Sequence, residues 1–148
     1  MKKLLTLSNV IKLAGVVFGL VAFFLMFGNQ LFIELLGNRG YVEFSDAMFG
    51  DYGSIITFFG YLLIFLASAG ACALVFVKVE NRKIIYLVLA GVLLLGAIFV
   101  FIEAAVVNGR TDANLYHLAA CPVIAGIFAI VAALALAASE FVPDKQLL

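Results

Sequence analysis

The sequence predicts an all-α integral membrane protein. Residues 1–148 are expected to form a single domain, an antiparallel four-helix transmembrane bundle. Three observations predict this fold. Of the 148 residues, 66% are hydrophobic and only 12% are charged, which is about half the charged share of a soluble domain. The mean hydropathy is +1.23. Four apolar runs could each cross a bilayer, and no polar stretch between them could form a separate folded domain.

The run at residues 84–107 is the most decisive of the four, because it contains one charged residue, Glu103, and no proline. As a helix it would reach about 36 Å, whereas the hydrocarbon layer is about 30 Å thick. A soluble domain of this size could not enclose such a helix on all sides. We therefore expect the other apolar runs to be membrane spans too.

The remaining spans are expected at residues 10–27, 55–77 and 115–138. No small-x-small cleavage site follows the first run, so we expect a retained span, with a helix that could continue through Leu36, and not a signal peptide. The short connection at residues 78–83 makes the second and third spans antiparallel neighbours.

The longest polar segment, residues 28–54, is the first outer loop in this prediction, and residues 37–40 have the composition of a turn. Its acids and aromatic residues suit a loop at the membrane interface, with rings at headgroup level. The acids lack the EF-hand spacing, which favours a solvated loop over a calcium site. We expect partner contacts from this loop at Glu34, Glu43, Phe44, Asp46, Asp51 and Tyr52.

The distribution of positive charge predicts the orientation. Seven of the nine lysines and arginines fall on one side of the predicted spans, and only Arg39 and Arg110 fall on the other. By the positive-inside rule both termini are cytoplasmic and the longer first loop is extracellular. We expect a multi-pass protein of the plasma membrane.

Small residues predict where helices approach closely. Gly15 and Gly19 form a G-x-x-x-G pattern in the first span, which indicates either a self-association face or internal packing. In the fourth span, alanines recur every four residues at Ala125, Ala129 and Ala133. Such a ridge is typical of close helix packing in membranes.

Glu103 is the main candidate for chemistry, because an ionisable residue within a span is a functional hypothesis by default. It lies near the outer end of its span, and Arg110 and His117 follow at about the same level. One interpretation is a polar contact that joins the third and fourth spans. The alternatives are exposure to an outer vestibule, or an ion- or proton-binding site that His117 tunes by titrating near neutral pH.

Several classes of protein are not indicated. The sequence has no Walker A loop, no H-E-x-x-H and no G-x-S-x-G motif, and its single histidine predicts no metal site and no cofactor. The layout of four spans with a longer first outer loop resembles claudin-like and MARVEL-type proteins in topology. The first loop has neither the tryptophan nor the cysteines of the claudin signature, so the resemblance implies no function.

The sequence therefore predicts a non-enzymatic interaction protein, either a scaffold or an accessory subunit of a membrane complex. Its expected partners are the lipid bilayer and either further copies of itself or another membrane protein, with no nucleic acid. The alternative is an oligomeric small ion or solute transporter or channel that uses Glu103 in the outer leaflet.

Overall fold

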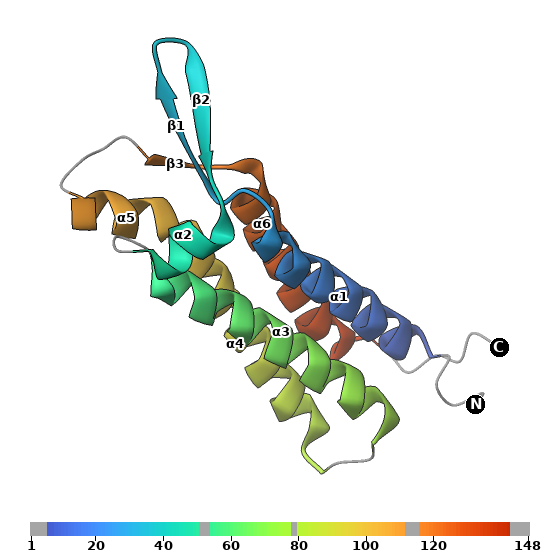
Figure 1. Cartoon of the computed structure of the whole chain (residues 1–148). Coiled ribbons are helices and arrows are strands. Elements are labelled where there is room, and N and C mark those ends of the chain that lie inside the picture. Colours follow the sequence, from blue (N-terminus) through green and yellow to red (C-terminus); the bar gives the residue numbers. More distant parts are fainter. Residues whose placement is uncertain (1–5, 51–53, 78–79, 112–115, 143–148) are drawn as a thin grey trace.

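The computed structural model describes residues 6–50, 54–77, 80–111 and 116–142, and the described part is mostly helical (Figure 1). Four of its helices are long and apolar enough to cross a membrane, which supports an integral membrane protein with several spans. They are α1 (Leu7–Phe24) with the 3₁₀ turn η2 (Leu25–Phe27), α3 (Ile55–Phe76), α4 (Arg82–Phe101) and α6 (Ala120–Ser139).

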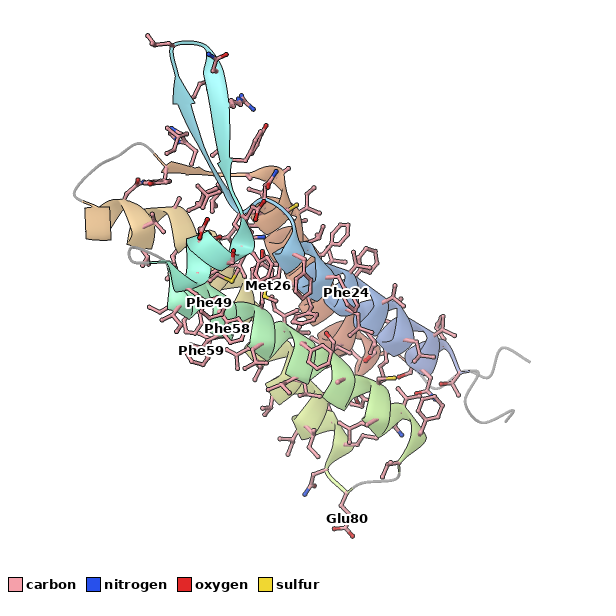
Figure 2. The ribbon with its side chains drawn as sticks, in the orientation of Figure 1. Phe24, Met26, Phe49, Phe58, Phe59 and Glu80 are labelled. Carbon is pink, nitrogen blue, oxygen red and sulfur yellow. The ribbon has the colours of Figure 1, made fainter. Side chains whose placement is uncertain are left out.

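The four long helices pack in a ring. Helix α1 contacts α3 and α6, and α4 contacts the same two helices. The interior of the ring is filled by apolar side chains such as Ile64, Leu93 and Leu136. Large apolar side chains also cover the outside, among them Phe24 and Phe59, which project away from the bundle (Figure 2). An apolar exterior and an apolar interior together are what a lipid solvent requires.

Glycines set the closest helix contacts. A Cβ on Gly60 would lie 2.9 Å from the carbonyl oxygen of Gly96, and one on Gly96 would lie 2.8 Å from that of Gly60. Only glycine permits this approach, so α3 and α4 meet backbone to backbone at these two positions.

The prediction of an all-α fold is wrong in one respect, because a small antiparallel sheet covers one end of the bundle (Figure 1). Its strands are β1 (Leu31–Leu35), β2 (Asn38–Val42) and β3 (Tyr116–Leu118), in the order β2-β1-β3. The first helix therefore does not continue through Leu36. Short helix α2 (Phe44–Phe49) follows the β1–β2 hairpin.

The sequence of β1 explains why it forms a strand. Its residues alternate, so Leu31 lies in an apolar cluster beneath the sheet with Ala47 and Val107, whereas Phe32 and Glu34 lie on the opposite, outer face. Pairing with β3 brings together segments that are about 85 residues apart. The sheet thus connects the first outer segment to the start of α6.

The helix predicted for residues 84–107 is divided at Ile102. Helix α4 ends at Phe101, and α5 (Glu103–Thr111) continues beneath the sheet (Figure 1). The predicted fourth span likewise starts late, because β3 occupies residues 116–118 and α6 begins at Ala120. Pro122 lies in the first turn of α6. Backbone N–H groups there have no partner within the helix, so proline is tolerated at this position.

Two ends of the bundle are distinguished below. The sheet end carries the sheet, α2 and α5 (Figure 1). The terminal end carries the starts of α1 and α4 and the end of α6, as shown by hydrogen bonds from Ser8 to the Ser139 carbonyl and from Arg82 to Asn9.

Candidate functional site

Glu103 is the first residue of α5 and lies at the sheet end, just beyond the end of the α4 span. Its side chain is fully buried, and neither carboxylate oxygen has a hydrogen-bond partner among the described residues. Burial raises the pKa of this carboxyl from its ordinary value of 4.5 to about 8. The group is therefore held mainly in its neutral form at pH 7.

A second polar group lies close to Glu103 inside the bundle. Tyr61 on α3 is fully buried and near enough to interact electrostatically with Glu103 and with Cys121 on α6. Its hydroxyl donates a hydrogen bond of 2.8 Å to Gln30 Oε1. The Gln30 amide nitrogen in turn donates to the carbonyl oxygens that follow α1, at Leu25, Met26 and Gly28. All the polar atoms of Gln30 are therefore used, and none is directed at Glu103.

The predicted group of Glu103, Arg110 and His117 is only partly described. His117 lies on β3 with an exposed side chain, and its ring centroid is 5.3 Å from that of Phe32 on the outer face of the sheet. No hydrogen bond or ion pair joins His117 to Glu103 in the part of the chain that the structure describes. Arg110 belongs to α5, but its side chain lies outside the described part.

A cavity of about 270 Å³ lies beneath the sheet. Leu31, Val107 and Tyr116 contribute to its wall from β1, α5 and β3, and Asp46 on α2 is the only charged group among its described lining residues. Val107 follows Glu103 by four residues, so the two lie on the same face of α5 and the cavity is one helical turn from the buried carboxyl.

The hairpin β1–β2 projects away from the helices (Figure 1). Its two central residues, Leu36 and Gly37, have φ values of 52° and 81°, the pattern of a type I′ turn. Leu36 is fully exposed, with a relative accessibility of 102%. A non-glycine residue at positive φ is strained, and an exposed leucine gains nothing from burial, so this residue serves neither the turn nor the core.

The outer face of the sheet carries an aromatic and charged row. The Phe32 ring lies between those of Tyr41 on β2 and His117 on β3, tilted to both, and the Arg39 guanidinium carbon lies 4.7 Å from the Phe32 ring centroid. Arg39 Nε lies 3.7 Å from Glu34 Oε2 in an exposed ion pair. The side chains of this face are held at fixed spacing by the strand register.

The other predicted contact residues have different environments. Glu43 precedes α2 and Asp46 lies in its first turn, both with exposed side chains. Phe44 is half-buried, and its ring centroid lies 5.1 Å from that of Phe27. Asp51 and Tyr52 lie outside the described residues.

The small residues singled out in the sequence lie inside the bundle. A Cβ on Gly15 would lie 3.1 Å from that of Ala135 on α6, and one on Gly19 would overlap the Ser68 side chain on α3. In this structure the G-x-x-x-G face is therefore occupied by α6 and α3 of the same chain. The alanines of the fourth span, Ala125, Ala129 and Ala133, are also buried in the core.

The structure contains a charged cluster at the terminal end that was not predicted from the sequence. Lys12 is 3% exposed, and its Nζ lies 2.9 Å from Glu140 Oε1 in an ion pair whose geometry falls short of a hydrogen bond. The same Nζ donates to Ser8 Oγ at 3.1 Å and lies 4.4 Å from the Tyr86 ring centroid. The signal that could have found this cluster is a lysine followed at once by an apolar span, with an acid at the end of the last span.

No group of three or more histidine, cysteine, aspartate or glutamate side chains capable of holding a metal ion occurs among the described residues. Comparisons with protein-family models, with curated proteins and with solved structures found no match to this chain. The projecting hairpin and the buried carboxyl group are the two features of the chain that bear on its function.

Proposed function

We propose that this chain is a small polytopic membrane protein that acts as a non-enzymatic interaction protein, either a scaffold or an accessory subunit of a membrane complex. In this proposal its four long helices form an antiparallel transmembrane bundle, and the terminal end faces the cytoplasm. The excess of lysine and arginine on that side supports the orientation. The sheet end then faces outward from the plasma membrane and carries the partner contacts.

The observation that carries the proposal is the position of Leu36 at the exposed tip of the hairpin. A leucine at the tip of a type I′ turn is strained by its positive φ and exposes its whole side chain. Asparagine or glycine would suit the turn better, so the turn does not account for the leucine, and in this proposal its side chain makes an apolar contact with another chain. Tyr41, on strand β2 of the same hairpin, is also 53% exposed.

Native mass spectrometry of the full chain in nanodiscs tests the proposal. We expect the wild type to retain a second copy or another membrane protein, and Leu36→Asn to lose this partner, because the variant keeps the turn and removes the apolar tip. Phe141→Asn is the matched control, since Phe141 is 70% exposed at the opposite end. A wild type that is strictly monomeric, with no other chain bound, would contradict the proposal.

A second candidate function is favoured by Glu103, a buried carboxyl group without a partner among the described residues. It is an oligomeric ion or solute transporter or channel, in which several copies together surround a path. Flux into liposomes, compared between the wild type and Glu103→Gln, tests this candidate. Equal flux from both proteins, or none from either, would end it.

A further inference from the structure

The ionisation state of Glu103 follows from its surroundings. An ionised carboxylate without a partner is very unfavourable in an apolar interior, and the usual response is that the group takes up a proton. Glu103 is fully buried, and both of its oxygens lack a described hydrogen-bond partner. Its neutral form is thus the one that fits this position.

A metal cation fits the position less well than a proton. Calcium and magnesium take about six or more oxygen ligands. Near Glu103 the structure provides the Tyr61 hydroxyl, which already donates to Gln30, and no cluster of three metal-binding side chains occurs among the described residues. A proton needs only the carboxylate itself.

The groups that face Glu103 do not hold it ionised. Helix α3 presents Tyr61, α6 places Cys121 near Tyr61, and α2 places Asp46 at the cavity. His117 on β3 lies on the outer face of the sheet, and the Arg110 side chain lies outside the described part. None of the described groups is a cation near the carboxyl, and burial is what favours the protonated form.

The cavity beneath the sheet lies close to Glu103 along α5. Its wall includes Val107, one turn along the same face of α5 from Glu103, and its one described charged group is the exposed Asp46. A carboxylate at an opening raises the local concentration of cations, protons included. Leu31 and Ala47, which pack with Val107 beneath the sheet, also line this cavity.

We propose that Glu103 is a proton-binding site that exchanges its proton with the solution at the sheet end through the cavity beneath the sheet. This inference rests on the second candidate function and deepens it by naming the proton as the ion. It is independent of the partner contact at Leu36.

Infrared difference spectroscopy of the full chain in liposomes, with one orientation, tests the proposal. The spectrum of Glu103→Gln is subtracted from that of the wild type while the pH is changed separately on each side. We expect a carboxylic-acid C=O band that disappears as the pH on the side of the sheet end rises past about 8. Glu140→Gln, which alters the acid at the other end, should leave this band unchanged.

The access route is tested by the exchange of the carboxyl proton for deuterium. Val107→Phe fills the cavity and should slow the exchange at least tenfold. Gly109→Phe is the matched control on the same helix, because Gly109 is exposed and a Cβ added there would meet nothing within 4 Å. Equal rates in the wild type and Val107→Phe would overturn the proposed route.

Two other results would overturn the proton site itself. One is a band that titrates near 4.5, as an ordinary glutamate does. The other is a band that responds only to the pH at the terminal end. Transport is judged separately. A titrating band without flux would support the proton site and contradict the transport function. Flux without a titrating band would support transport and contradict the proton site.

Discussion

At the terminal end of the bundle the ammonium group of Lys12 is buried, and at the sheet end the carboxyl group of Glu103 is buried. Lys12 has a carboxylate, a hydroxyl and an aromatic ring around it, from Glu140, Ser8 and Tyr86. Glu103 has no described hydrogen-bond partner at all. The first arrangement keeps a charge by compensating it, which ties α1 and α6 together, whereas the second favours the neutral form of the carboxyl group.

The largest expected effect is the pH dependence of stability caused by Glu103. Its pKa is about 8 in the folded protein and 4.5 ordinarily, so between these values the folded state holds the proton that the unfolded state has lost. The free energy of unfolding should therefore fall by roughly 4 kcal/mol as the pH rises from 4.5 to 8. Denaturant titrations in mixed micelles at several pH values measure this, and Glu103→Gln should remove the dependence.

Removal of the positive charge at the terminal end should have the next largest effect. Lys12→Met leaves Glu140 without its cation, and we expect the free energy of unfolding to fall by about 3 kcal/mol, as for other broken buried pairs. Lys83→Met is the control, because Lys83 is exposed and contacts only the Phe141 ring among the described interactions. Similar losses in both variants would show that the Lys12 pair contributes no more than a surface charge.

Each end of the bundle has a buried tyrosine with one hydrogen bond, so the stability cost of losing that bond can be compared between the ends. Tyr61→Phe leaves the buried Gln30 Oε1 without a donor and should cost about 2 kcal/mol. Tyr86→Phe removes a 3.2 Å bond to the Ala71 carbonyl, which lies within a helix and can keep its helical bond, so we expect about 1 kcal/mol. Thermal unfolding in detergent would rank the two, and a larger loss for Tyr86→Phe would reverse the comparison.

The smallest expected effect is a gain at the hairpin. Leu36→Asn relieves strain at positive φ and should raise stability by about 0.5 kcal/mol. Gly37→Ala should lower it, because φ is 81° there. Hydrogen exchange of the β1–β2 amides measures both changes locally. A loss of protection in Leu36→Asn would mean that the leucine supports the turn.

The sequence was sufficient for the four long helices, because uniformly apolar runs of about 20 residues have few other solutions in lipid. The sheet was missed because its turn is Leu36-Gly37, whereas the polar residues that suggested a turn, such as Asn38, begin β2. Strand β3 has three residues and depends on pairing with a distant segment. No local pattern records such a contact.

The surroundings of the buried charged residues also depend on contacts between distant segments, which the sequence does not show. Glu103 was recognisable from its residue type, but the lack of a partner depends on which side chains the fold brings near it. The break after α4 falls at Ile102, and no glycine or proline at that position indicates it in the sequence. Lys12 was assigned to the cytoplasmic side from its charge, and only the packed helices reveal that its ammonium group lies inside the bundle next to Glu140.

The contact between Gly60 and Gly96 has a consequence for biogenesis. It joins two helices that are consecutive in the chain, so α3 and α4 can associate soon after both have left the ribosome. Helix α1 can then pack against α3 at Gly19, but its second packing surface, at Gly15, is covered only when α6 is synthesised. Truncation before residue 120 should accordingly preserve the α3–α4 pair while leaving the Gly15 surface of the first helix uncovered and more accessible to membrane proteases.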